Sequence, residues 1–276
     1  MEIEIVMETK TFAKQIRYKS LEMVYNAKAS HVAGALSIAD VLAVLYNTVM
    51  HIDSKNPDMV DRDYLIYSKG HTCVALYAAL ALKGFYPEAC LNDYGKENSP
   101  FISHVSSKIP GVEFSTGSLG HGLPVSCGLA LAFKRQLRSN RVFCIVGDGE
   151  MDEGSNWEAM LFAAQNHLDN LCLLVDVNKI QAMGETCDII NLENLSDKFS
   201  SFGWSCFRID GNDISNIENA LAEFPSKNGN PTAIICDTIK GKGVSFMEGN
   251  LRYHYAPPSK DELDIAIKEL GISDND

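Results

Sequence analysis

Hydrophobic positions along the chain follow two alternating patterns. Short runs of apolar and β-branched residues are separated by longer segments in which apolar residues recur every three or four positions. Runs that are apolar on both faces suit strands of a parallel sheet covered on both sides, and the longer spacing is typical of amphipathic helices. The runs expected to form strands are Tyr64–Tyr67, Val142–Val146, Leu171–Val175, Cys206–Ile209 and Ala233–Cys236.

The helical pattern appears in segments between and beside these runs. Ser37 is expected to be the N-cap of one helix, and others are expected over His71–Leu82, Trp157–Leu168 and Ser259–Gly271. Alternation of strands and helices predicts an α/β fold with a doubly wound, mostly parallel sheet of about five strands and helices on both faces. No repeat or linker divides the chain, so residues 1–276 are expected to form one domain, with the acidic SDND end frayed.

Composition narrows the function classes. The chain has 24 Lys and Arg against 36 Asp and Glu, a net charge of −12, which argues against nucleic acid as a partner. No apolar stretch approaches the length of a membrane span and no secretion signal is evident, so we expect a cytoplasmic protein that does not enter membranes. Eight scattered cysteines without a CxxC pair predict neither disulfides nor a zinc site.

Polar residues directly follow two of the expected strands, at the edge of the sheet where a ligand would bind. Gly147-Asp148-Gly149 follows one strand, and Asn178 follows the next. Carboxyl ends of parallel strands meet at one edge of the sheet, so Asp148 and Asn178 should converge. Two oxygen-bearing side chains, with the Ile180 carbonyl as a possible third ligand, suit Mg²⁺ bound to a diphosphate. The glycines allow the backbone to approach a phosphate.

A Gly-Asp-Gly turn alone is common, but the combination with Asn178 resembles the thiamine diphosphate-binding motif. The surrounding segments GDGEMDEGSNWEA and LDNLCLLVDVNKIQ resemble the transketolase family in particular.

Further segments resemble the same family, in the family's order, between about residue 20 and residue 258. They are HVAG at 31–34, SKGH at 68–71, IPGVEFSTGSLGHG at 109–122 and TIKGKGVSFMEGNLRYHYAPP at 238–258. The resemblance implies a thiamine diphosphate-binding fold and transfer of a two-carbon ketol unit from a ketose to an aldose. The substrates would be sugars or sugar phosphates.

The chain stops where the family's first domain ends. The pyrimidine-binding and C-terminal domains are therefore expected on a partner chain, the C-terminal transketolase subunit, in an assembly with two copies of each chain.

The resemblance also implies roles for individual residues. Thiamine diphosphate would be held by His71, Gly117, Ser118, Leu119, Gly147, Asp148, Gly149, Glu150, Asn178 and Ile180. Mg²⁺, or Ca²⁺ or Mn²⁺ in its place, would be held by Asp148, Asn178 and Ile180. The histidines expected to contact the sugar and move its protons are His31, His71, His104 and His254.

Two glutamates carry a weaker expectation. Glu153 and Glu158 match positions where cofactor sites of the family communicate through hydrogen bonds at a subunit interface. Alternatively, Ser155 and Glu158 form a capping box that only begins a helix. His121 stands where the family usually has Gln and is given no role.

Departures from the family pattern lie on the sugar side, at Val32-Ala33, around His104 and at Ser118, whereas the metal motif is intact. A transketolase for a specialised sugar is therefore one alternative, and a protein resembling 1-deoxyxylulose-5-phosphate synthase is another. An NAD-dependent dehydrogenase would need a different glycine spacing. A non-catalytic partner subunit would not need Asp148 or Asn178.

Overall fold

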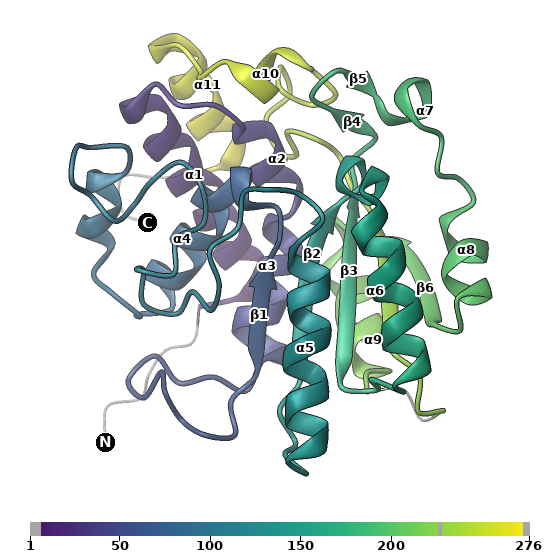
Figure 1. Cartoon of the computed structure of the whole chain (residues 1–276). Coiled ribbons are helices and arrows are strands. Elements are labelled where there is room, and N and C mark those ends of the chain that lie inside the picture. Colours follow the sequence, from purple (N-terminus) through teal and green to yellow (C-terminus); the bar gives the residue numbers. More distant parts are fainter. Residues whose placement is uncertain (1–6, 226–227, 273–276) are drawn as a thin grey trace.

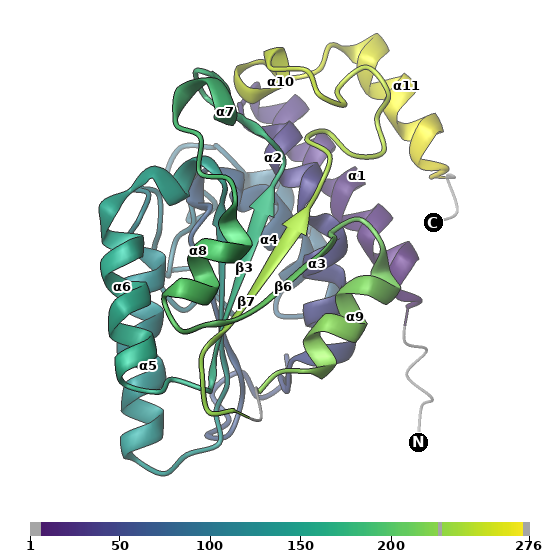
Figure 2. The ribbon, with the colours of Figure 1, turned by 90° about the vertical axis from the view of Figure 1, so that its right-hand side faces the viewer.

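The structure is a computed structural model, which describes residues 7–225 and 228–272. All five runs expected to form strands do so, in one parallel sheet with the strand order β1-β2-β3-β7-β6 (Figures 1 and 2). The strands are β1 (Tyr64–Tyr67), β2 (Val142–Gly147), β3 (Leu171–Val177), β6 (Ser205–Asp210) and β7 (Thr232–Asp237). The predicted parallel α/β fold is confirmed. The expected frayed end, SDND, lies outside the described residues.

Two layers of helices cover the sheet, as predicted (Figure 1). One face packs against α1 (Thr9–Ala27), α2 (Val32–Ser37), α3 (Ala39–Val44), α4 (Cys73–Leu82) and α9 (Ile214–Ala222). The other packs against α5 (Gly122–Arg135), α6 (Gly154–Gln165) and α8 (Leu195–Ser201). Strand residues alternate between the layers: Phe143 and Ile145 point to the first, Cys144 and Val146 to the second.

The carboxyl ends of the strands share one edge, which irregular segments surround. In the register, Gly147 of β2 pairs with Asp176 of β3, and Val177 of β3 pairs with Asp237 of β7. The segments around this edge include 3-10 turns at Gly70–Thr72 and Gly149–Asp152, a hairpin of β4 (Ile180–Gln181) and β5 (Gly184–Glu185), α7 (Thr186–Ile189) and α10 (Arg252–Tyr255). A π-helical turn at Leu45–Val49 and a 3-10 helix at Glu88–Asp93 lie elsewhere.

The helix boundaries partly follow the sequence pattern. The C-terminal helix α11 (Lys260–Leu270) has Ser259 as its N-cap in a capping box with Glu262, and Gly271 ends it in a left-handed conformation at φ 64°. The helix expected from His71 begins at Cys73, after a 3-10 turn. The helix expected over Trp157–Leu168 is α6, which begins and ends earlier.

The prediction that Ser37 is an N-cap is wrong. Ser37 is the last residue of α2, and its buried hydroxyl donates to the carbonyl of Gly34 and to the carboxylate of Asp176. The expected helix is α3, which begins at Ala39 with Ile38 at its N-cap, and the separate helix α2 begins after His31, which adopts a left-handed conformation with φ 70°. The apolar pattern was correct, but the hydroxyl is used by a distant carboxylate rather than by a helix end.

Among the described residues, we find no helix that is both long and apolar enough to cross a membrane. All eight cysteines are free thiols, and most are buried, where they pack as small apolar side chains.

Candidate active site

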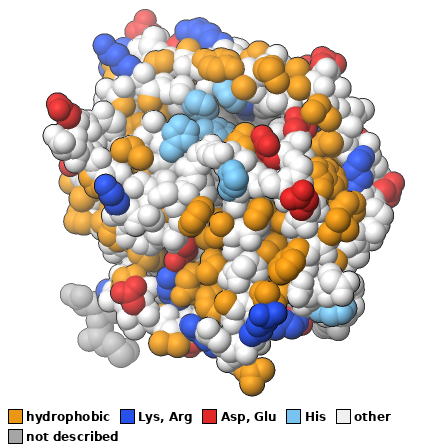
Figure 3. Space-filling view, viewed as in Figure 1, with side chains coloured by type: hydrophobic (Ala, Val, Ile, Leu, Met, Phe, Trp, Pro, Cys, Tyr) orange, Lys and Arg blue, Asp and Glu red, His pale blue; other side chains and the backbone are white. Residues whose placement is uncertain are grey.

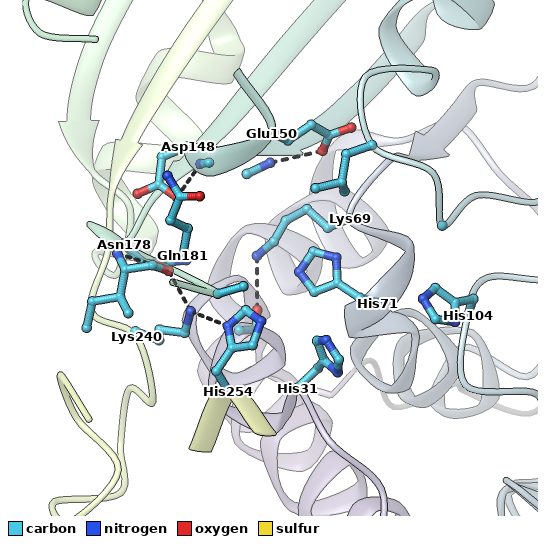
Figure 4. Close-up of a pocket in the computed structure, with 17 residues that line it drawn as sticks. His31, Lys69, His71, His104, Asp148, Glu150, Asn178, Gln181, Lys240 and His254 are labelled. Carbon is cyan, nitrogen blue, oxygen red and sulfur yellow. Dashed lines mark hydrogen bonds between the residues drawn. The ribbon is translucent and has the colours of Figure 1, made fainter. Parts of the chain in front are cut away.

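A cavity of about 280 Å³ opens at the carboxyl edge of the sheet (Figure 4). The residues expected from sequence that line it are His31, His71, His104, Gly117, Leu119, Gly147, Asp148, Gly149, Glu150, Asn178, Ile180 and His254. Residues far apart along the chain therefore meet here. Figure 3 shows the histidine side chains gathered at the upper centre of the face seen in Figure 1.

Asp148 and Asn178 lie on the same side of this cavity because the strands before them are hydrogen-bonded neighbours. Each is only 8% exposed. The Asp148 carboxylate accepts from the backbone N–H of Gly149 at 2.9 Å and of Lys179 at 2.6 Å. The side-chain oxygen of Asn178 accepts from the N–H of Ile180 at 3.2 Å. The loop after β3, which contains Asn178 and Lys179, is thus folded back onto the loop after β2, which contains Asp148.

Two glycines, Gly147 and Gly149, form part of the cavity wall. A Cβ added to Gly149 would come within 2.8 Å of the Cβ of Gln181, so only glycine lets the hairpin β4-β5 pack onto this turn. A Cβ on Gly147 would extend toward the Lys69 side chain, 3.7 Å away. Both glycines line the cavity next to Asp148.

Two buried carboxylates, those of Asp148 and Asp176, lie close together at the site. Lys69 forms an ion pair with Asp176, and both side chains are almost completely buried. Burial, followed by the nearby Asp176 carboxylate, raises the pKa of Asp148 to about 6. A carboxylate held next to another carboxylate is stabilised by an added cation, so the donor set fits a divalent ion bound through oxygen.

The hairpin β4-β5 is fixed by side chains from the C-terminal segment and from the turn after β2. Lys240 donates to the Ile180 carbonyl at 2.5 Å, and Tyr255 donates to the Ala182 carbonyl at 2.6 Å. Gln181 donates to Asp152 at 3.0 Å. The Ile180 carbonyl therefore already faces a cation within the chain.

Three histidine rings form a cluster on the opposite side of the cavity (Figure 4). The His31 ring centroid lies 5.2 Å from that of His71 and 4.9 Å from that of His254. Burial, above all, lowers the pKa of His31 to about 4, that of His254 to about 3, and that of His71 well below its usual value. All three are neutral at pH 7 and can both donate and accept hydrogen bonds.

Comparisons with known proteins identify this arrangement. Residues 8–276 match the family model described as "Transketolase, thiamine diphosphate binding domain". The chain belongs to the transketolase family. It is 42% identical to 6-deoxy-6-sulfo-D-fructose transketolase subunit SqwG from Clostridium sp. (strain MSTE9), over 94% of each chain. It is also 42% identical to a subunit of apulose-4-phosphate transketolase from Actinobacillus succinogenes, again over 94% of each.

Solved transketolases share the fold. The structure from Campylobacter jejuni has a TM-score of 0.90 and 32% identity, covering 100% of this chain but 44% of that one. The structure from Leishmania mexicana also has a TM-score of 0.90, at 28% identity, covering 96% of this chain and 42% of that one. The chain thus spans less than half the length of these transketolases but nearly all of the two relatives above.

These matches settle the general class. The chain is a transketolase-type transferase with a thiamine diphosphate-binding fold, and the names of its relatives, which are subunits, imply a partner chain. The thiamine diphosphate-binding domain that it matches supports this cofactor. Neither a dehydrogenase nor a synthase of the 1-deoxyxylulose-5-phosphate type is favoured.

Four residues expected at or near the transketolase site do not line the cavity. Ser118 is exposed, between Gly117 and Leu119, which do line it, and His121 is exposed at the start of α5. Glu153 and Glu158 are exposed at the start of α6 and on its outer surface. Any contact that these glutamates make with a second cofactor site therefore requires another chain.

The capping box expected from Ser155 and Glu158 is wrong. Glu153 occupies the N-cap of α6, and no side chain caps that end. Ser155 instead donates to the Gly120 carbonyl at 2.7 Å, which joins α6 to the loop that contains Gly117 and Leu119. Glu150 lines the cavity but is 2% exposed and accepts from the N–H groups of Gly120 and Gly147 and from Ser68.

Several residues that line the cavity had no role predicted from sequence. They are Gly34, Lys69, Gln181, Ala182 and Lys240. Lys69 and Lys240 lie inside the SKGH and TIKGKG segments that were already singled out, so a lysine within a matching motif was the available signal. Burial and Lys69 lower the pKa of Lys240 to about 8.

Proposed function

We propose that this chain is the diphosphate-binding half of a split transketolase that transfers a two-carbon ketol unit from a ketose to an aldose. One observation carries the proposal most directly: Asp148 and Asn178 meet at neighbouring strand ends beside the glycines that open the cavity. The family match supports the cofactor class, and this geometry supports the choice of residues that would hold it.

In this proposal, Asp148, Asn178 and the Ile180 carbonyl hold Mg²⁺, with Ca²⁺ or Mn²⁺ able to replace it. The Ile180 carbonyl, which also accepts from Lys240, would use its second lone pair for the ion. Gly147 and Gly149 leave room for the diphosphate, and His71 lies next to it. Glu150 holds the turn around Gly147 from behind, and Gly117 and Leu119 border the cofactor rings. When bound, thiamine diphosphate supplies a carbanion and an electron sink for carbon–carbon cleavage.

The chain's own contribution to the transfer is binding, charge and proton movement. His31, His104 and His254 face the space where a sugar would enter, and we propose that they contact its hydroxyl groups. His31 and His254 are neutral at pH 7, and one ring nitrogen of each already bonds within the chain, to Ser30 and to Lys240, so each has one nitrogen left for a sugar oxygen. Lys240 donates to the Nδ1 atom of His254 at 3.0 Å, which leaves the proton of that ring on Nε2.

We propose that the partner chain carries the pyrimidine-binding half, and that the assembly holds two copies of each chain. Glu153 and Glu158 would then lie at a subunit interface. Leu161 and Phe162 of α6, which are 59% and 44% exposed, favour such a contact because they place apolar area beside these glutamates. Apolar side chains are spread across this region in Figure 3. The single domain and the cytoplasmic location stay predictions.

The substrate is proposed to be a specialised ketose, free or phosphorylated. Two relatives that are 42% identical over nearly their whole length are named for 6-deoxy-6-sulfo-D-fructose and apulose-4-phosphate, whereas human transketolase is 34% identical. Sequence departures on the sugar side, at Val32-Ala33 and Ser118, fit this proposal.

Replacing the central carboxylate tests the proposed function. Asp148→Ala should abolish Mg²⁺-dependent binding of thiamine diphosphate, measured by calorimetry, and ketol transfer by the complex with its partner. Asp188→Ala, which removes an exposed carboxylate on α7, should change neither. Full ketol transfer by the Asp148 variant, or stabilisation of the unaltered chain by NAD but not by thiamine diphosphate with Mg²⁺, would refute the proposal.

A further inference from the structure

Asp176 lies behind the cavity wall and does not line it, yet it contacts residues from four parts of the site. It is completely buried at the end of β3. Its carboxylate accepts from Ser37 at 2.7 Å, from Asn178 Nδ2 at 3.2 Å, and from Lys69 and Thr238. These contacts suggest a part in the site for a carboxylate that cannot itself reach a bound ligand.

The contact with Asn178 determines how its amide is oriented. An amide has an oxygen that accepts and a nitrogen that donates, and the two ends are similar in size. An ionised carboxylate only accepts, so the nitrogen of Asn178 must face Asp176. The oxygen is then left on the opposite side, where it accepts from the N–H of Ile180. A cation bound at this site needs that oxygen, since an amide nitrogen does not ligate Mg²⁺.

The same carboxylate also fixes the Lys69 ammonium, which faces the cavity. Lys69 donates to Asp176 and, at 3.0 Å, to the Gly34 carbonyl. Besides this ammonium, the hydroxyl groups of Thr238 and Ser37 donate to the Asp176 carboxylate. The carboxylate therefore stays an acceptor, with two hydroxyl groups holding it in one orientation.

We propose that Asp176 is a positioning residue for the metal–diphosphate site, which acts by holding the Asn178 amide with its oxygen toward the bound cation. This inference rests on the proposed function. Groups behind metal ligands commonly change metal affinity about 10- to 100-fold when they are replaced. An amide at position 176 both donates and accepts, so it would let Asn178 rotate either way.

The test compares Asp176→Asn with Asp40→Asn in the full-length chain assembled with its partner. Asp40 is the matched control because it is also buried, paired with a cation, Arg17, and bonded to an amide, Asn212 Nδ2 at 2.9 Å, but lies outside the cavity. The measurement is the Mg²⁺ concentration that gives half-maximal binding of thiamine diphosphate. We expect this concentration to rise about 10- to 100-fold for Asp176→Asn and to stay unchanged for Asp40→Asn. Both variants should lower the unfolding midpoint.

Thr238→Val provides a second measurement should Asp176→Asn fail to fold. It removes one hydroxyl that orients the carboxylate and leaves every charge in place. The Mg²⁺ concentration should rise in the same direction, by roughly 3- to 10-fold, a smaller effect than that of replacing Asp176. An unchanged Mg²⁺ concentration in the variants that fold, or an equal rise for Asp40→Asn, would overturn the positioning role. Failure of the unaltered complex to bind thiamine diphosphate at any Mg²⁺ concentration would instead refute the proposed function.

Discussion

Two buried ion pairs, Arg17–Asp40 and Lys69–Asp176, show how similar burial serves different purposes. In the first, the guanidinium makes two bonds to the carboxylate, at 3.0 Å and 2.6 Å, and a third to the Leu36 carbonyl. The pair joins α1 to α3, and the cavity lies elsewhere. Because a planar guanidinium matches a carboxylate at two points, this pair fixes the relative position of two helices.

The second pair has a different geometry and place. The Lys69 ammonium is a compact point charge, and it reaches Asp176 while one side of the lysine lines the cavity. The carboxylate is shared with Asn178, a proposed metal ligand. A buried ion pair is weak evidence for stability by itself. The surroundings of a buried ion pair, helix surfaces or a ligand cavity, therefore indicate whether its loss affects the fold alone or binding as well.

Lys69→Met should give the largest effect. It leaves the Asp176 carboxylate buried without its cation and close to Asp148, which costs about 3–5 kcal/mol of unfolding free energy. The same variant removes a positive charge from the proposed diphosphate site, so affinity for thiamine diphosphate should fall at least about tenfold. Urea unfolding and calorimetric titration measure the two effects separately.

Arg17→Met should destabilise the fold by a similar amount without touching the cavity. Asp40 would lose its cation, and we again expect about 3–5 kcal/mol. Affinity for thiamine diphosphate, measured where the variant is fully folded, should equal that of the unaltered chain. A tenfold loss of affinity here would erase the distinction between the two pairs.

Gly149→Ala should affect binding more than stability. The added Cβ would come within 2.8 Å of the Gln181 Cβ and displace the hairpin β4-β5 that carries the Ile180 carbonyl. We expect a loss of about 1–3 kcal/mol of unfolding free energy and a clear loss of cofactor affinity. Gly154→Ala at the start of α6 is the control, because no atom lies within 4 Å of its added Cβ, and it should leave affinity unchanged.

The smallest expected effect is a change in how the stability of the fold depends on pH. The pKa values of His31 and His254 are lowered to about 4 and about 3, so the folded state binds fewer protons than the unfolded state, in which these pKa values are about 6.5. Stability should therefore be lost as the pH falls from about 6.5 toward 4. Replacing both histidines by Gln should flatten this fall, measured as the unfolding midpoint between about pH 6.5 and about pH 4.

The sheet could be predicted from sequence because strands that are buried on both faces are recognisable from their own residues. Runs such as Val142–Val146 are apolar at every position, and nothing distant is needed to identify them. Convergence of Asp148 and Asn178 followed from the same pattern, since strand ends in a parallel sheet share an edge.

The rest depended on contacts that local sequence does not encode. Ser37 and Ser155 have the side chain of an N-cap residue, yet one hydroxyl serves Asp176 and the other serves the Gly120 carbonyl. Asp176 was missed because it lies within an apolar strand, and its partners Lys69 and Thr238 are 107 and 62 positions away. The partners of these polar side chains are set by tertiary hydrogen bonds, which the local sequence does not reveal.

A crystal structure of the chain with its partner, thiamine diphosphate and Mg²⁺ would test the central claim most directly. The account predicts a cation about 2.1 Å from oxygens of Asp148, Asn178 and the Ile180 carbonyl, and also in contact with the diphosphate. Thiamine diphosphate bound in this cavity with its cation away from both Asp148 and Asn178 would contradict it.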